Sequence, residues 1–315
     1  MSLIEKFQTI IILIAVFIGL LLGQFNFIQQ HAESLIIPFL ILMLYGLFLT
    51  TPLKNLKDAF KNIRFLSAST IINFVWTPLL AWGLGAVFLA DHPALWIGFI
   101  MLMVTPCTDW YLVFTSIAKG NVPLSTSVLP INLILQLVLL PVYLFIFAGT
   151  IETISVSTIF ESVVLVLILP FALAHLTRIV LKKRVTLLNA KVIPFFASSQ
   201  IIFLCLAVAA MFASQGSYLI NNLELISILF VPILLYFFIN FIVSKLVGKL
   251  LKFSYEDAVS LNLTIIARNS PIALAIAVTA FPDQPMIALA LVIGPLIELP
   301  VLAVVSQALL MMRKK

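Results

Sequence analysis

Long apolar runs alternate with short polar clusters along nearly the whole chain of 315 residues. A helix needs about 20 apolar residues to cross the hydrocarbon core of a bilayer, and most of the runs approach or exceed that length. The pattern therefore predicts an all-α membrane protein with ten transmembrane helices. The predicted spans are 7–27, 34–51, 63–90, 93–118, 123–148, 157–180, 190–213, 224–249, 255–281 and 283–311.

The composition supports this class, because 63% of the residues are hydrophobic and only 10% are charged. Soluble domains are about 45–50% apolar and about 25% charged, which excludes a soluble enzyme, a nucleic-acid-binding protein and a secreted disulfide scaffold. The two cysteines, Cys107 and Cys205, both lie within apolar runs. Two thiols exclude a multi-cysteine metal site, and we expect no metal, no cofactor and no enzymatic activity.

The net charge of +6 comes from Lys and Arg residues that lie mostly between the apolar runs or at their ends. Of the 18 Lys and Arg residues, all except Arg268 precede the first run or cluster after every second run. The alternate connections carry acidic residues and no Lys or Arg. Positive connections stay on the cytoplasmic side, so we expect a multi-pass protein of the cell membrane with both termini in the cytoplasm.

The ten spans divide into two halves of five, residues 1–150 and 151–315. Five is an odd number, so the second half must enter the membrane from the opposite face, and the halves are predicted to be inverted repeats. An offset of 162 residues pairs similar positions of the two halves: Cys107 with Asn269, Thr108 with Ser270, Pro123 with Pro285, and Gln136 with Glu298.

The fourth span of each half is interrupted near its middle by a proline among polar residues, at 105–109 and at 268–271. Proline removes a backbone donor and clashes with the preceding turn. Interruptions at matching places in two halves indicate the binding site of a secondary transporter, because broken helices present free carbonyls and half-helix ends at mid-depth. A pair of proline kinks that serve packing only is the alternative.

Three ionised residues, Asp109, Arg268 and Glu298, lie near the centres of their spans. A charge at this depth costs at least about 2.5–3.5 kcal/mol, so the three are expected to face each other or a wet cavity. If Arg268 neutralises one carboxylate, the other is free to bind a proton or another cation. The sequence leaves open which acid pairs with Arg268, and an ion pair that only holds helices together is the alternative.

Neutral polar groups at the same depth offer hydrogen bonds to an oxyanion or a hydroxylated solute. Each one alone is equally well explained as a contact between helices. A thiol in the first break suits a thiophilic solute, although it also suits close packing. The candidate substrate-binding residues are Cys107, Thr108, Asn132, Gln136, Asn269 and Ser270, with Thr264 at the same depth.

Short motifs in spans four, five, nine and ten carry a resemblance to a known family. They are Pro106-Cys107-Thr108, AKGN at 118–121, Asn269-Ser270 with ALAIA at 273–277, and GPLIELP at 294–300. With these motifs the chain resembles the bile acid:sodium symporter superfamily, and within it the arsenical-resistance branch of arsenite efflux permeases. The resemblance implies one transporter unit in which the two broken helices cross. Its panel part would comprise 7–51 and 157–213, and its core part 63–148 and 224–311.

The resemblance also implies roles for single residues. In the arsenite branch a cysteine of the broken fourth span and a glutamate of the tenth form the functional pair, and Cys107 and Glu298 occupy those positions. Thr264 and Arg268 stand where sodium-coupled members carry a glutamate and a glutamine as sodium ligands. A fixed guanidinium repels sodium, so we expect coupling to protons rather than to sodium.

We therefore expect a secondary active transporter that extrudes arsenite or antimonite in exchange for protons, with Asp109, Arg268 and Glu298 in ion coupling. Two alternatives stay open. One is an ion-coupled symporter of organic anions, such as bile-acid-like or small carboxylate solutes, with Arg268 as the carboxylate clamp. The other is a membrane sensor that binds a small solute without moving it.

Overall fold

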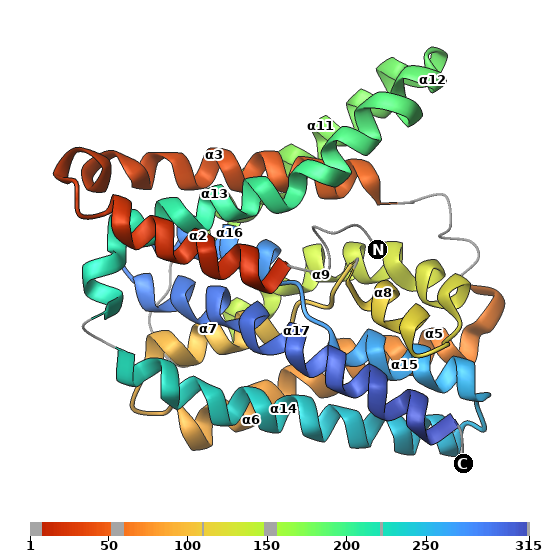
Figure 1. The fold of residues 1–315 in the computed structure, drawn as a ribbon. Coiled ribbons are helices and arrows are strands. Elements are labelled where there is room, and N and C mark those ends of the chain that lie inside the picture. The colour runs from red at the N-terminus through yellow and green to blue at the C-terminus, as the bar shows by residue number, and fades with distance from the viewer. Residues whose placement is uncertain (1–7, 52–59, 109, 148–155, 221–222, 314–315) are drawn as a thin grey trace. The chain divides into compact units, whose positions relative to one another are not determined.

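The fold is that of a computed structural model, which describes residues 8–51, 60–108, 110–147, 156–220 and 223–313. Every regular element within these residues is a helix, and a single isolated antiparallel bridge pairs Pro106 with Arg268. Figure 1 shows the helices coloured in chain order. The all-α prediction is confirmed for this part of the chain.

Several short elements join end to end into longer helical stretches. The π-helical turns η3, η5 and η7 each continue directly into the α-helices before and after them. The elements up to residue 147 are α2 (Gln8–Leu22), α3 (Asn26–Thr50), η2 (Phe60–Asn62), α5 (Ile63–Ile71), η3 (Ile72–Trp76), α6 (Thr77–Phe88), α7 (Pro93–Met103), α8 (Trp110–Ile117) and α9 (Val122–Phe147). The later ones are α10 (Val156–Val163), η5 (Val164–Ile168), α11 (Leu169–Val180), η6 (Leu181–Lys183), α12 (Val185–Leu187), η7 (Leu188–Val192), α13 (Ile193–Ile220), α14 (Leu223–Leu250), α15 (Tyr255–Ile266), α16 (Ser270–Ala280) and α17 (Pro285–Arg313).

Seven helical stretches of the described residues are long and apolar enough to cross a membrane. They are Asn26–Thr50, Phe60–Phe88, Val122–Phe147, Phe160–Lys183, Val185–Ser214, Ser227–Leu250 and Pro285–Arg313. Shorter apolar helices lie at Ile10–Leu22, Pro93–Met103 and Ser270–Ala280. The last two are halves of interrupted helices, each too short to span the hydrocarbon core alone. The count of ten spans and the inverted repeat remain predictions.

The first helical connection differs from the predicted one. Helix α3 begins at Asn26, inside the run predicted to end at 27 and eight residues before the predicted span at 34. The extra turns include several polar residues, and they are held by local bonds such as that from His31 Nδ1 to the Phe27 carbonyl, 2.8 Å. A helix needs only its own backbone hydrogen bonds to continue, so its end and the end of an apolar run need not coincide.

The chain forms two compact units of mutually contacting residues. The first contains 1–51, 154–225 and 271–292, and the second contains 52–153, 226–270 and 293–315. Both interrupted fourth spans contribute their breaks to the second unit, with Ser270 as its last residue before the chain enters the first unit. The functional division into a panel and a core part remains a prediction.

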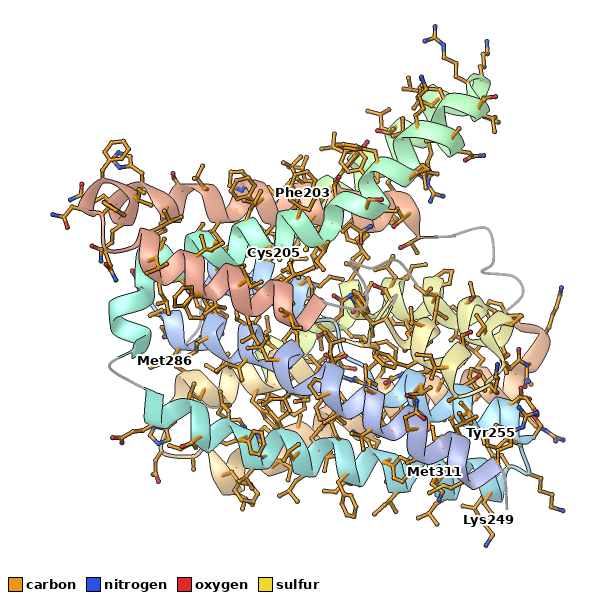
Figure 2. The ribbon with its side chains drawn as sticks, in the orientation of Figure 1. Phe203, Cys205, Lys249, Tyr255, Met286 and Met311 are labelled. Carbon is orange, nitrogen blue, oxygen red and sulfur yellow. The ribbon has the colours of Figure 1, made fainter. Side chains whose placement is uncertain are left out.

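In the first unit, α13 packs along α2 and α3 (Figure 1). The Gly19 and Gly23 pair of α2 lies against the α13 backbone: a Cβ added at Gly19 would lie 2.4 Å from the Ala209 carbonyl oxygen, and one at Gly23 would lie 2.6 Å from that of Ala213. Small residues four apart let two membrane helices approach this closely. Cys205 lies on α13 in this unit (Figure 2).

A methyl group at Gly19 should destabilise the protein, because the backbone oxygen that it meets cannot swing aside as a side chain can. We expect Gly19→Ala to lose about 1–3 kcal/mol and to lower the melting temperature of the detergent-purified protein. The matched control is Gly83→Ala, since a Cβ at Gly83 meets nothing within 4 Å. Equal melting temperatures of the two variants would contradict the close contact between α2 and α13.

Candidate functional site

Two helix breaks that lie in the second unit form the framework of the site. The first is interrupted between the end of α7 at Met103 and the start of α8 at Trp110, and the second between the end of α15 at Ile266 and the start of α16 at Ser270. Pro106 has no backbone N–H to continue the first helix, and Pro271 stands in the first turn of α16, where a missing N–H costs no helical hydrogen bond. The breaks therefore fall where the prolines and polar residues predicted them.

The two broken segments pair with each other through a single antiparallel bridge and its flanking backbone hydrogen bonds. The Cys107 N–H donates to the Ala267 carbonyl at 3.0 Å, and the Asn269 N–H donates to the Thr105 carbonyl at 2.7 Å, on either side of the bridge between Pro106 and Arg268. Backbone groups that lost their helical partners thus find new ones across the crossing. The two breaks therefore lie against each other in this unit, and the crossing of the two whole helices stays a prediction.

Side chains reinforce the crossing. The Thr105 hydroxyl lies 3.2 Å from the Asn269 carbonyl and also within bonding distance of the Met101 and Leu102 carbonyls. The Asn269 amide nitrogen donates to the Thr108 hydroxyl at 3.2 Å. Thr108 and Asn269 therefore lie together in the breaks, as the sequence predicted, and Ser270 follows as the first residue of α16.

Arg268 is 2% exposed, and its guanidinium is held by uncharged oxygens. Nη1 donates to the Met103 carbonyl at 2.8 Å, and Nη2 donates to Asn73 Oδ1 at 2.8 Å and to the Ile265 carbonyl. Nε donates to the Ile266 carbonyl at 3.3 Å. These bonds use four of the five N–H donors of the side chain.

Glu298 contacts the same residue in a way that the sequence did not suggest. Its Oε1 accepts a hydrogen bond of 2.8 Å from the backbone N–H of Arg268, and the side chain is 4% exposed. This bond comes from the main chain, and the guanidinium donates to carbonyl oxygens and to Asn73 Oδ1. Which carboxylate pairs with the Arg268 guanidinium stays a prediction. Asp109, the other candidate partner, lies outside the described residues.

The candidate residues on α9 and α15 are buried amides and hydroxyls. Asn132 and Gln136 of α9 are at most 1% exposed, and within the described part of the chain neither their amide nitrogens nor their amide oxygens have a hydrogen-bond partner. The Thr264 hydroxyl of α15 is in the same situation. Helix α9 packs against α7, α8 and α15. Buried amides that lack partners are costly, which favours a polar solute or water as their partner.

Asn73 and Tyr236 are site residues that the sequence analysis missed. Asn73 lies in the π-helical turn η3 and also donates through Nδ2 to the Thr264 carbonyl at 3.5 Å. The Tyr236 ring lies 5.7 Å from the Arg268 guanidinium carbon, and its hydroxyl donates to the Met103 carbonyl at 3.2 Å. Asn73 could have been found as a polar residue within an apolar run, whereas nothing distinguishes Tyr236 from the many other aromatic residues.

The two thiols occupy different settings. Cys107 is 2% exposed and lies in the break itself, next to the bridge. Cys205 is part-buried on α13 of the first unit, within an apolar run. Only Cys107 is placed with the charged residues of the second unit.

Comparison with known proteins defines the class. Residues 37–222, more than half of the chain, match the Sodium Bile acid symporter family, and the chain belongs to this family. The family resemblance predicted from the sequence is confirmed.

Individual members of this family are similar to the chain over most of its length. The arsenical-resistance protein Acr3 of Corynebacterium glutamicum is 26% identical over 337 residues, which covers 100% of this chain and 90% of that protein. The Acr3 of Alkaliphilus metalliredigens is 22% identical over 95% of this chain and 90% of its own length. The uncharacterized sodium-dependent transporter YocS of Bacillus subtilis is 26% identical over 79% of this chain and 75% of its own length. Family, relatives and apolar helices together identify an integral membrane transporter.

The bond between Glu298 and the Arg268 N–H predicts how two substitutions will differ. Glu298→Ala leaves a buried donor without that acceptor, which costs about 1–3 kcal/mol and should lower the melting temperature. Glu298→Gln keeps an acceptor oxygen, which is neutral and therefore binds the N–H less strongly, and should melt between the Ala variant and the wild type. Thermal unfolding of the purified variants measures both, and a Gln variant as unstable as the Ala variant would show that the charge, and not the hydrogen bond, stabilises the break.

Proposed function

We propose that the protein extrudes a trivalent metalloid, arsenite or antimonite, in exchange for protons. In this proposal Cys107 contacts the metalloid, with hydrogen bonds from Thr108, Asn269 and Ser270, and Glu298 or Asp109 carries the proton. The transporter class rests on the family and the relatives. The solute and the coupling ion are proposed from the chemistry of the site and from the Acr3 relatives.

The backbone of the residue that carries the thiol and the side-chain carboxylate of Glu298 bond to one peptide unit of the second break, and this arrangement carries the proposal. The Cys107 N–H bonds the carbonyl of Ala267, and the N–H of the next residue, Arg268, bonds the carboxylate of Glu298. A group that binds a soft metalloid and a group that binds a proton are therefore linked by one peptide unit. Binding of the metalloid to Cys107 can therefore alter the proton affinity of Glu298, and the reverse, through a shift of that short segment.

One thiol suits a cargo that must be released again. Arsenite, As(OH)3, exchanges one hydroxyl for the Cys107 sulfur: an As–S bond forms, an As–O bond breaks, and the thiol proton leaves with the hydroxyl as water. The reverse reaction frees the solute without any oxidant or reductant. The remaining hydroxyls match groups that both donate and accept hydrogen bonds, such as the amides of Asn132 and Gln136 that have no partner among the described residues.

The Arg268 hydrogen bonds weigh against an organic anion as the main solute. A carboxylate clamp needs two parallel N–H donors, whereas four of the five donors of Arg268 already hold oxygens of the protein. A carboxylate would have to replace several of these bonds. We therefore favour the uncharged metalloid hydroxide over the carboxylate solute.

Replacement of the thiol tests the solute. Expressed in an arsenite-sensitive host, the wild type should restore growth on arsenite, and Cys107→Ser should lose this protection because oxygen is a poorer ligand for trivalent arsenic. Cys205→Ser is the matched control and should protect as the wild type does. No protection by the wild type would end the metalloid proposal, and protection by Cys107→Ser equal to that of Cys205→Ser would end the role of Cys107.

Replacement of the carboxylate tests the coupling ion. In proteoliposomes that hold the wild type, arsenite movement should drive proton movement in the opposite direction, with sodium replaced by choline. Glu298→Gln keeps the hydrogen bond to Arg268 but cannot ionise, so its coupled flux should fall by about tenfold or more, equal to about 1.4 kcal/mol or more.

Undiminished coupled flux in Glu298→Gln would end the role of Glu298 and leave Asp109 as the proton carrier. Two results would contradict the coupling proposal itself. The first is arsenite transport without a proton flux, and the second is binding of arsenite without accumulation or release, which would point to a sensor.

A further inference from the structure

The Arg268 guanidinium lies in a cage of uncharged oxygens. Its ligands are the carbonyls of Met103, Ile265 and Ile266 and the side-chain oxygen of Asn73, and the Tyr236 ring lies 5.7 Å from its central carbon. Hydrogen bonds to an ionised donor are roughly twice as strong as neutral ones, and an aromatic face attracts a cation. The protein thus surrounds the guanidinium of Arg268 in the way that a binding site surrounds a cationic ligand.

The crossing of the breaks creates this cage. In an uninterrupted helix the Met103 carbonyl would accept from the N–H of Cys107, and the Ile265 carbonyl from that of Asn269. Both donors instead bond across the bridge, to Ala267 and Thr105. The two carbonyls are left at the C-terminal ends of α7 and α15, where the helix dipoles place partial negative charge.

Free carbonyls at half-helix C-terminal ends are the groups with which broken membrane helices bind a sodium ion. The family name implies sodium, yet the residues here do not fit a free ion: the guanidinium already bonds these oxygens, and a second cation would meet its full charge at close range. The guanidinium, which is covalently attached to the chain, therefore occupies the place that a bound ion would take.

We infer that the Arg268 side chain is a tethered cation that takes the place of a free alkali cation at the crossing of the two breaks. The carrier then needs no sodium, because the required positive charge is part of the chain and never leaves. Removal of the side chain should open a cage that binds sodium or the small guanidinium ion. The statement that the carrier needs no sodium rests on the proposed function. The cage itself does not, because it is defined by the contacts of Arg268 alone.

The test uses purified full-length protein and needs no transported solute, so a failure of arsenite transport leaves it decisive. Melting temperatures of the wild type and of Arg268→Ala are measured in choline chloride, and again with sodium, potassium or guanidinium at equal ionic strength. Guanidinium is used at millimolar concentrations, far below those that denature proteins.

We expect the wild type to be indifferent to the cation. Arg268→Ala should melt lower in choline and recover by roughly 2–4 °C, in a saturable manner, with sodium or guanidinium. Arg178→Ala is the matched control. Arg178 also donates to carbonyls at the C-terminal end of a helix, those of Leu49 and Thr51 at the end of α3, but this site is part-buried and lies in the first unit. Its melting temperature should show no preference among the cations.

Two results would overturn the inference: saturable stabilisation of the wild type by sodium, or an Arg268→Ala protein that no cation stabilises more than choline does. If Arg268→Ala cannot be purified, Arg268→Lys replaces it. The Lys variant keeps a tethered charge, so it should be as indifferent to sodium as the wild type. A saturable sodium response of the Lys variant would also overturn the inference.

Discussion

Two backbone hydrogen bonds between the broken helices set the geometry of the site. They join Cys107 to Ala267 and Asn269 to Thr105, and they tie together segments more than 150 residues apart in sequence. In hydrocarbon each unsatisfied backbone group costs several kcal/mol, so two interruptions at one depth are tolerable when each supplies the partners that the other lacks. The same exchange strips helical donors from the carbonyls of Met103 and Ile265. The hydrogen bonds between the two breaks therefore determine the position of the Arg268 guanidinium.

The arginine in turn explains why the breaks remain ordered. A bare pair of helix C-terminal ends facing each other would be repelled by their like dipole charges. One guanidinium bonded to both ends turns this repulsion into attraction, and hydrogen bonds to a charged group contribute about 1.5–3 kcal/mol each. Two such bonds are enough to offset an insertion cost of about 2.5–3.5 kcal/mol for the charge. Arg268 and the crossing thus stabilise each other.

The class of membrane transporter, the helix breaks and the buried charged residues could be predicted from the sequence, because each of them depends on particular types of residue. Long apolar runs predict spans, Pro106 and Pro271 predict breaks, and an isolated Arg268 or Glu298 in an apolar run stands out. The actual partners could not be predicted in the same way. Most atoms that hold Arg268 are carbonyls, and the donor to Glu298 is a main-chain N–H; every residue has such groups. The start of α3 was missed because helical hydrogen bonding continues through polar residues.

A fixed cation changes what a proton can do in the proposed carrier. If the positive charge never leaves, the charge of the empty site is set by its acids, and a proton is the ion that can alter it. Glu298 accepts the Arg268 N–H through one oxygen, and a carboxyl group that has gained a proton keeps the capacity to accept a hydrogen bond. Loading a proton therefore need not break the bond to the crossing, but it weakens the bond, because a neutral acceptor binds an N–H less strongly than a charged one. Protonation would loosen the peptide unit next to Cys107, and the state of the proton would reach the thiol through one short segment of backbone.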